Sequence, residues 1–492
     1  MLGQDHLSAT QAPVRGAVTR PLALALLVFL CAALTGHAAF GWIGKNKKNL
    51  QEASPQSPPP VFDPRDMPAL FDARCFYQKA FAPVFTKSLS SGHVTVHTTI
   101  EPRLQEHLQT LFQKYSPLIA AGVVLDAGTG AVLAMANYTR GSAGRDLLPD
   151  GEENYCLYAG FPAASLIKII TAAAALETGG FAPDRTIPVS GGYHTLHRSQ
   201  LDLVQARRHA EQVPLEKAFA LSINPFFGKL LIHHLSDSDF LKTADGFLFN
   251  APLAFDLPVQ QSTLVPPTTD FERAEVASGY NTRTRVSPLH AAMIASLAAN
   301  EGAIMRPYLV DRVVDAAGNE IYHKTVTCLS RPLGSMSVQQ LRILMQGTVR
   351  TGTARSSFAG LLARPDAKDW ITGGKTGSID LPEHRGRCDW FAGFGQNGGT
   401  RVAVACILIH GANRTVRSSY VASQAVLACL AETAPAVAAA QPARAFRKHA
   451  AHKETGPALR TSQGAGKQAG RAKHRAATKK KRALPVETAA GG

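Results

Sequence analysis

Two periods of hydrophobic spacing mark the start of the folded part of this chain. Residues 93–100 alternate between apolar and polar side chains, which predicts a strand. Over residues 101–115 the apolar positions recur every three or four residues, which predicts a helix. Two short apolar runs, 122–126 and 131–135, flank the tetrapeptide Ala-Gly-Thr-Gly. This arrangement predicts a β-hairpin.

The hydrophobic pattern predicts further helices and strands towards the C-terminus. A helix is expected to begin near Ser165 and to end at a Gly-Gly pair, and residues 181–300 read as mostly helices and loops. Three strand candidates and a final helix then follow: 370–378, 389–396, 400–409 and 420–432. Strands at both ends with helices between predict an α+β domain, residues 93–432, whose sheet unites N- and C-terminal segments.

The first 92 residues do not share this pattern. Residues 21–43 form a run without Asp, Glu, Lys or Arg that is long enough to cross a bilayer. We therefore predict a membrane anchor there, with residues 1–20 on the cytoplasmic side; a cleaved signal peptide is the alternative. Basic residues lie on both flanks, so charge does not fix the orientation. Residues 44–92 include a Pro/Ser/Gln stretch and read as a linker or stalk.

The charge of the chain is concentrated in its tail. Residues 433–492 contain thirteen Lys and Arg residues and two Glu, which is +11 of the net +16. Large apolar side chains are almost absent there, so we predict a disordered basic tail. On the outside of a cell it could hold anionic envelope polymers, and nucleic acid would be out of reach. The hydrophobic fraction of 45% is ordinary for a globular protein.

The seven cysteines give no indication of a metal site. None has the CxxC or CxxH spacing that zinc sites use. Disulfides are possible in an exported domain, but the sequence does not pair them. We expect no metal and no cofactor.

Three short strings, each occurring once, suggest the chemistry. In Ser165-Leu-Ile-Lys168 the two polar side chains fall on one face of a helix, three residues apart. A serine hydroxyl needs an adjacent base to act as a nucleophile, and apolar neighbours favour the neutral lysine that can accept its proton. A helix N-terminus would also favour developing negative charge. Alone, the pair could equally be a helix cap followed by a solvated lysine.

The other two strings are Ser222-Ile-Asn224 and Lys375-Thr376-Gly377. The first could relay a proton and bind a carbonyl, although a plain turn before proline would also explain it. The second lies on a predicted strand after two glycines, where an extended peptide could pair along the edge. A phosphate-binding loop is excluded, because that motif needs glycine six residues before the lysine and Asp369 stands there.

Together, and in this order, the strings resemble the penicillin-binding proteins, the D,D-transpeptidases that cross-link peptidoglycan. Several further segments are similar to that family, and the likeness covers roughly residues 93–432: His97-Thr-Thr-Ile-Glu-Pro-Arg-Leu-Gln105, Ala121-Gly-Val-Val-Leu-Asp-Ala-Gly-Thr-Gly130, Val286-Ser-Pro-Leu-His290, Ala298-Ala-Asn-Glu-Gly302 and Asp389-Trp-Phe-Ala-Gly-Phe394. The resemblance implies a β-lactamase/transpeptidase-like fold, with an antiparallel sheet flanked by helices and a mostly helical subdomain.

The resemblance also implies a role for each motif residue. Ser165 attacks the D-Ala-D-Ala carbonyl and Lys168 takes its proton. Ser222 and Lys375 help to return that proton to the leaving amine. Asn224 orients the amide of the substrate. Thr376 and Ser378 bind the terminal carboxylate of the substrate, and Gly377 permits its close approach. The backbone N–H groups of Ser165 and Ser378 form the oxyanion hole, and β-lactams acylate the same serine.

Several alternatives stay open. A D,D-carboxypeptidase would resolve the acyl-enzyme with water rather than an amine. A β-lactamase is less favoured, because no Glu-x-x-Leu-Asn segment follows Ser222. From another class, a non-catalytic β-lactam sensor or scaffold would keep the same motifs. The short stretch between the predicted anchor and the domain suggests no glycosyltransferase module and no large pedestal, so which cell-wall machine is served stays undecided.

Overall fold

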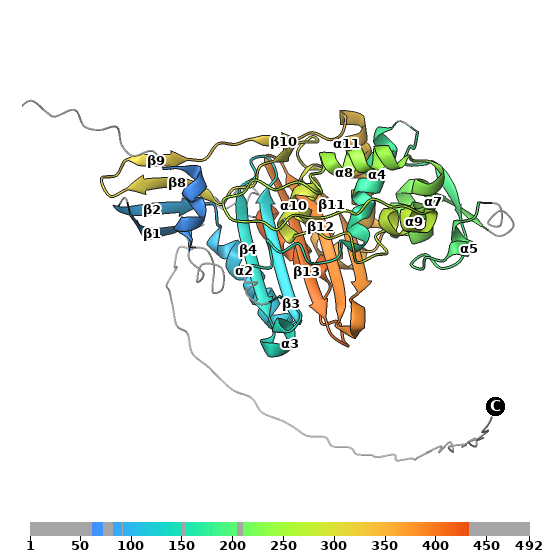
Figure 1. Ribbon diagram of the computed structural model, residues 1–492, viewed down its shortest axis with the longest axis horizontal. Coiled ribbons are helices and arrows are strands. Elements are labelled where there is room, and N and C mark those ends of the chain that lie inside the picture. Colours follow the sequence, from blue (N-terminus) through green and yellow to red (C-terminus); the bar gives the residue numbers. More distant parts are fainter. Residues whose placement is uncertain are drawn as a thin grey trace, which may run out of the picture. The chain divides into compact units, whose positions relative to one another are not determined.

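An antiparallel sheet of five strands forms the centre of the fold (Figure 1). The computed structural model describes residues 62–71, 82–90, 92–149, 154–178, 180–203 and 210–431. The strands of this sheet, in spatial order, are β11 (Ile371–Asp380), β12 (Arg387–Asn397), β13 (Thr400–His410), β3 (Ile119–Asp126) and β4 (Val132–Thr139). The predicted hairpin and the three C-terminal strands are thus confirmed, and β13 pairs with β3 to join the two ends of the domain.

Both faces of this sheet are buried, because alternate residues of each strand enter different cores. In β3, Ile119 and Val123 belong to one core, whereas Ala120 and Val124 belong to the other. The second core is closed by three helices: α2 (Pro102–Tyr115), α12 (Arg355–Leu362) and α13 (Ser418–Ala431). This double burial explains why β3 and β13 are nearly continuous apolar runs rather than alternating ones.

The first core is covered by most of the remaining helices, which lie between residues 164 and 350; the short helix at 198–201 instead packs in a small third cluster. Their bounds are η2 (Ala164–Ile167), α4 (Lys168–Glu177), α5 (Arg198–Leu201), α6 (Leu215–Ala220), α7 (Asn224–His233), α8 (Asp237–Gly246), α9 (Asp270–Ser278), α10 (Pro288–Ser296) and α11 (Ser335–Arg350). Four shorter strands form two small pairs: β5 (Thr186–Val189) with β6 (Glu211–Pro214), and β7 (Ile304–Met305) with β10 (Cys328–Ser330). The expected α+β architecture with a mostly helical part is therefore present, and it holds further short elements: α3 (Gly141–Arg145), η4 (Pro365–Ala367) and η5 (Pro382–His384).

The predicted linker, residues 44–92, is shorter than expected, because part of it is folded and contributes to a second sheet. Within the 44–92 segment the structure has a helical turn, η1 (Pro64–Leu70), and a strand, β1 (Val84–Leu89). The order of this sheet is β1-β2-β8-β9, and its other strands are β2 (Gly92–Thr98), β8 (Val310–Asp315) and β9 (Glu320–His323). The physical reason is burial, since Met67, Leu70 and Phe71 enter the first core.

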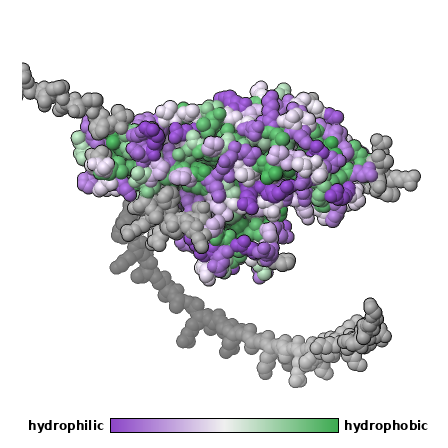
Figure 2. Space-filling view, viewed as in Figure 1, coloured by the Kyte–Doolittle hydropathy of each residue, from purple (hydrophilic) through white to green (hydrophobic). Residues whose placement is uncertain are grey.

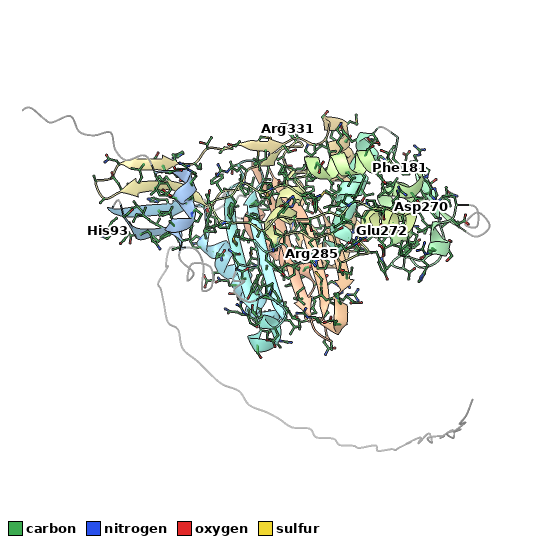
Figure 3. All side chains as sticks on the ribbon, in the orientation of Figure 1. His93, Phe181, Asp270, Glu272, Arg285 and Arg331 are labelled. Atoms are coloured by element: carbon green, nitrogen blue, oxygen red, sulfur yellow. The ribbon has the colours of Figure 1, made fainter. Side chains whose placement is uncertain are left out.

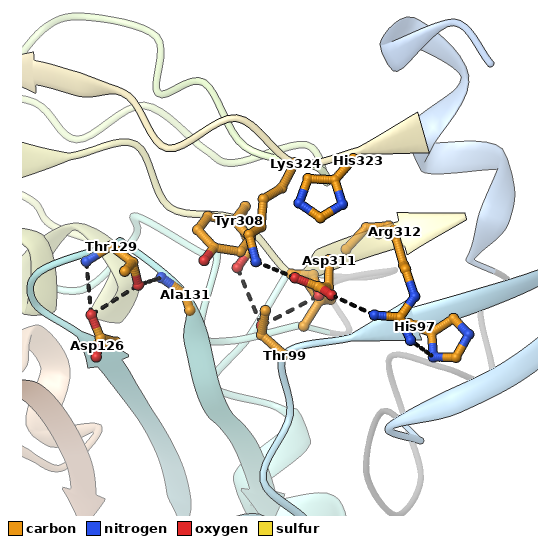
Figure 4. Close-up of polar contacts among 12 residues, drawn as sticks. His97, Thr99, Asp126, Thr129, Ala131, Tyr308, Asp311, Arg312, His323 and Lys324 are labelled. Atoms are coloured by element: carbon orange, nitrogen blue, oxygen red, sulfur yellow. Dashed lines mark hydrogen bonds and ion pairs between the residues drawn. The ribbon is translucent and has the colours of Figure 1, made fainter. Parts of the chain in front are cut away.

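Polar contacts join the second sheet to the hairpin of the first (Figure 4). The Thr99 hydroxyl donates to the carbonyl oxygen of Val132 over 2.7 Å, while the Thr99 N–H donates to Leu309. In the hairpin turn, Asp126 Oδ1 accepts from both the N–H and the hydroxyl of Thr129. The Asp126–Thr129 bonds fix the turn, and the Thr99 bonds connect the hairpin to the segment that directly follows β2.

The predicted anchor, 21–43, and the predicted tail, 433–492, lie outside the described residues. Within the described residues, no helix is long and apolar enough to span a membrane. On the face shown in Figure 2, hydrophilic and hydrophobic residues are interspersed. Of the cysteines that the structure describes, Cys156, Cys388 and Cys406 are buried free thiols.

Candidate active site

Ser165 lies on η2, directly before α4, and not in the first α-helical turn that the sequence suggested. Ala164, the residue before it, has a φ of 47°, a left-handed conformation outside the helical range. Such a strained residue persists only where its surroundings hold it. The tighter turn still places Ser165 three residues before Lys168, and its side chain is partly exposed while that of Lys168 is buried.

Four oxygen atoms surround the Nζ atom of Lys168. Two of them only accept hydrogen bonds: Asn224 Oδ1 at 2.7 Å and the backbone oxygen of Ser278 at 2.8 Å. The other two are hydroxyls, Ser165 Oγ at 2.7 Å and Ser222 Oγ at 3.3 Å. A neutral amine has two N–H donors and one lone pair. The two acceptors take the donors, so the lone pair is left for the serine hydroxyls.

Burial supports the neutral form of this lysine. Removal from water lowers the pKa of Lys168 well below its usual 10.5, and the nearby charge of Lys375 lowers it further. Burial alone lowers the pKa of Lys375 to about 7. No carboxylate is among the causes of either shift, so neither lysine is held as an ammonium by an ion pair. Lys168 is thus suited to accept a proton from Ser165 at neutral pH.

The second string, residues 222–224, lies in the turn between α6 and α7 and ends at the first residue of α7. Ser222 has a left-handed φ of 59°, and Asn224 opens α7 with its N–H donating to the Tyr193 carbonyl oxygen over 2.7 Å. The side-chain Nδ2 of Asn224 donates to the carbonyl oxygen of His194 over 3.0 Å. This bond fixes the orientation of the amide, because the carbonyl oxygen of His194 can only accept. Asn224 Oδ1 therefore faces Lys168.

The C-terminal end of α9 supplies the remaining lysine contact. Its first turn carries Asp270 and Glu272, labelled in Figure 3, and its last residue is Ser278. The next residue, Gly279, has a φ of 71° and approaches the backbone of Ala164. Carbonyl groups at a helix end lack intrahelical partners. One of them, on Ser278, accepts from Lys168 instead.

The third string lies on β11, at the edge of the sheet beside η2. A β-carbon on Gly377 would lie 3.3 Å from the backbone nitrogen of Ser165, so the small residue lets the strand approach Ser165. Lys375 is buried and its Nζ donates to the Thr376 carbonyl oxygen over 2.9 Å. The hydroxyl of Thr376 is hydrogen-bonded to that of Thr353, which follows α11.

A groove of about 630 Å³ opens over these residues. Six of the eight residues named from the sequence line it: Ser165, Ser222, Asn224, Thr376, Gly377 and Ser378. Lys168 and Lys375 are buried beneath it and interact with each other electrostatically. The fold thus brings together all eight residues from three distant parts of the chain.

Four further residues at this site gave no sequence signal. Ser278 contributes only its backbone oxygen, and His194 contributes a backbone oxygen and lines the groove. The side chains of Thr353 and Arg387, which lie outside the motifs, contact Thr376 and Ser378. In the described part of the chain, no cluster of three His, Cys, Asp or Glu residues could hold a metal ion.

Comparison with known proteins identifies this arrangement. The family described as "Penicillin binding protein transpeptidase domain" matches residues 120–429. The peptidoglycan D,D-transpeptidase PbpA of Mycobacterium tuberculosis is 27% identical over 377 residues, which cover 69% of this chain and 72% of that protein. Penicillin-binding protein PbpB of Mycolicibacterium smegmatis is 26% identical over 283 residues, covering 55% and 40% respectively.

A solved structure agrees with these relatives. The imipenem acyl-enzyme complex of penicillin-binding protein A from M. tuberculosis superposes with a TM-score of 0.54 at 26% identity. The match covers 68% of this chain and 80% of that one. Because the family match spans most of the described residues and contains all three motif strings, the chain belongs to the penicillin-binding protein transpeptidase family.

Proposed function

We propose that this protein is a peptidoglycan D,D-transpeptidase that cross-links stem peptides through an acyl-enzyme on Ser165. The observation that carries the proposal is the environment of Lys168, whose Nζ lies 2.7 Å from Ser165 Oγ and is also within hydrogen-bond distance of two acceptors, Asn224 Oδ1 and the Ser278 carbonyl oxygen. A general base at hydrogen-bond distance from a hydroxyl is what nucleophilic acyl transfer requires. The names of the relatives, a D,D-transpeptidase and a β-lactam acyl-enzyme, point to the same chemistry.

In the first step, Ser165 Oγ attacks the carbonyl carbon of the penultimate D-alanine while Lys168 accepts the hydroxyl proton. The backbone N–H groups of Ser165 and Ser378 stabilise the oxyanion, a role supported by the close approach of Gly377 to the Ser165 nitrogen. Thr376 and Ser378, which line the groove, bind the terminal carboxylate. D-Alanine leaves once its nitrogen has received the proton.

The proton reaches the leaving nitrogen through the residues around Lys168. Ser222 Oγ lies 3.3 Å from Lys168 Nζ and lines the groove, so it can pass a proton from the lysine to the substrate. Lys375, with a pKa of about 7, adds a charge that discourages a lasting ammonium on Lys168. Asn224 positions Lys168 and presents its amide to the substrate backbone.

We further propose that the catalytic domain acts outside the cytoplasm, held by an anchor at residues 21–43, because its substrate is in the cell wall. The basic tail would then face anionic envelope polymers. A protease-accessibility assay on intact spheroplasts tests this topology. Protection of the catalytic domain from external protease would contradict it.

The test of the chemistry is intact-mass measurement with a penicillin. The wild-type protein is expected to gain one stable penicillin adduct, and Ser165→Ala to gain none. A wild type that gains no adduct would refute the proposal. Incubation with a stem peptide and an amine then separates the alternatives, since a transpeptidase gives the cross-linked product and a carboxypeptidase gives only the shortened acid.

A further inference from the structure

The loop between β5 and α5 carries a histidine whose side chain has no role in the proposed steps. His194 is exposed and lines the groove together with Ser165 and Ser222. Among the described residues of this lining it is the only histidine. Imidazole is the side chain that gains and loses a proton near neutral pH. A group that can change its charge therefore lines the same groove as the nucleophile.

This loop is held in place by Gln200, whose side chain is buried. The Nε2 of Gln200 donates to the carbonyl oxygens of Ser190 and Gly192 over 3.1 Å and 3.0 Å. Its Oε1 accepts from the N–H of His197 over 2.9 Å. Because these bonds fix the loop on both sides of His194, the histidine is presented to the groove at a defined place.

The backbone of His194 is connected to the proposed base. Its carbonyl oxygen accepts from Asn224 Nδ2 over 3.0 Å, and the Oδ1 of the same amide accepts from Lys168 over 2.7 Å. His194 also has a hydrogen bond with the backbone of Ser222, whose hydroxyl lies 3.3 Å from Lys168 Nζ. The histidine thus contacts both residues of the second string that surround the lysine.

The charges that act on the imidazole are positive. Partial burial is the main cause that lowers the pKa of His194, and the charge of Lys168 is the next. Lys375 lowers this pKa further, while a backbone hydrogen bond raises it. No carboxylate of the described residues is among these causes. In the neighbouring part of the structure, the Tyr193 hydroxyl donates to Glu211 Oε2 over 2.5 Å, so that carboxylate is already bonded.

The repulsion between two basic groups is mutual. If a charge on Lys168 disfavours protonation of His194, a proton on His194 disfavours protonation of Lys168 by the same free energy. Lys168 is fully buried, whereas His194 is exposed, so water stabilises the imidazolium better than the ammonium. Of the two, the histidine therefore takes up a proton first as the pH falls.

We infer that His194 is a positioning residue for the general base: its carbonyl oxygen orients Asn224, and its imidazolium, formed as the pH falls, keeps Lys168 neutral. The inference rests on the role that the proposed function gives to Lys168. A neutral lysine can still accept the proton of Ser165, so acylation continues at a lower pH than the lysine alone would allow. Loss of the imidazole moves the acid limb of the acylation profile to higher pH.

The test is the rate of penicillin labelling of the full-length protein in detergent, measured from pH 5 to pH 9. His194→Gln keeps the carbonyl and loses the charge, and its acid limb is expected to lie about 0.5 pH unit above that of the wild type, a loss of about threefold in rate in acid. His194→Arg carries a permanent charge, so its acid limb is expected to lie no higher than that of the wild type. The control is His93→Gln, an exposed histidine of β2 outside the groove lining, which should follow the wild type (Figure 3).

Two further measurements depend on charge rather than on shape. In 1 M KCl the difference between wild type and His194→Gln is expected to shrink, because salt screens charges across a solvent-filled groove. In protein with ¹³C-labelled histidine, the pKa of His194 measured by NMR is expected to be higher in Lys168→Met than in the wild type, because the repelling charge is gone. This reciprocal titration decides the matter if the His194 variants do not label at any pH.

The outcomes separate this inference from the proposed function. The same acid limb in wild type and His194→Gln overturns the inference, and so does an unchanged His194 titration in Lys168→Met. An equal upward displacement in His194→Gln and His194→Arg would show that the side chain acts through its shape, which also overturns it. In each case a wild type that takes up a penicillin on Ser165 leaves the proposed function standing. A wild type that takes up none contradicts the proposed function itself.

Discussion

Gly279 approaches the carbonyl oxygen of Ala164 so closely that a β-carbon on the glycine would lie 1.8 Å from that oxygen. Both residues have left-handed backbones, with φ values of 71° and 47°. The contact joins the end of α9 to the residue before the nucleophile. The carbonyl that precedes Gly279, on Ser278, accepts from Lys168, so the same end of α9 contacts both Lys168 and the residue before Ser165.

Gly279→Ala is expected to abolish penicillin labelling of Ser165, because the new methyl group must displace the Ala164–Ser165 backbone. A matched control is Gly318→Ala, which has a φ of 88° but no atom within 4 Å of the added carbon. The control should lose about 1 kcal/mol of unfolding free energy through its backbone conformation and keep its labelling rate. Normal labelling of Gly279→Ala would show that the contact does not position Ser165.

Lys168→Met is expected to slow acylation by roughly a thousandfold, within the range that a general base contributes. The measurement is the rate of penicillin labelling, with circular dichroism to confirm that the fold persists. Lys229→Met serves as the control, because Lys229 is equally buried but donates to the carbonyl oxygen of Pro188, away from Ser165. Near-normal labelling of Lys168→Met would assign the base to another group.

The buried Lys375 predicts a dependence of stability on pH. Its pKa is about 7 in the folded protein against 10.5 when exposed, so between these values the unfolded chain binds the additional proton. Stability conferred by this group therefore rises with pH from about 7 to 10.5. Below pH 7 both states are protonated, and the full cost of burying the charge remains.

Thermal unfolding of wild type and Lys375→Met, followed from pH 6 to pH 10 at constant ionic strength, measures this effect. The difference in stability between the two proteins is expected to move in favour of the wild type as the pH rises, because the variant lacks the titrating group. A difference that stays constant across this range would mean that Lys375 is not neutral in the folded state.

The indole of Trp390 fixes the segment before the nucleophile. Its Nε1–H donates to the Pro162 carbonyl oxygen over 2.9 Å, and the side chain is fully buried. Trp390→Phe removes the stronger of the two donors to that carbonyl and leaves only the Cys388 thiol, which should cost about 2 kcal/mol of unfolding free energy. It should also slow penicillin labelling. Trp370→Phe, a buried residue of the opposite core, should lose stability with labelling unchanged. Equal labelling by the two variants would argue against a positioning role.

Much of the fold could be predicted from the sequence where local pattern and burial agree. The hairpin of β3 and β4 and the strand β13 are largely apolar runs next to glycine-containing turns, and they formed as expected, as did β11 and β12. β1 was missed because its side chains alternate only weakly and follow a proline-rich stretch. This segment becomes a strand because it pairs with β2, and the strand preferences of its individual residues do not predict that pairing.

For the site, side chains with a chemical role were visible in sequence and backbone groups were not. The serine–lysine spacing placed Ser165 near Lys168, although the intervening turn is 3-10 rather than α-helical. The carbonyl of Ser278 carries no sequence signature, because every residue has one and only the fold decides which meets Lys168. Arg387 was equally hidden, since its partner Ser378 lies across a strand pair rather than along the chain.

The pairing of β13 with β3 has a consequence for how the protein is made. Val402 pairs with Asp126, 276 positions apart in sequence, and β13 separates β3 from the strand that carries Lys375. Contacts of such separation form slowly, after a large loss of chain entropy. A chain that has emerged only as far as β11 leaves β3 with an unpaired edge, open to association with other chains. The exposed edge of β3 is therefore the place where a chaperone would prevent association until β13 arrives.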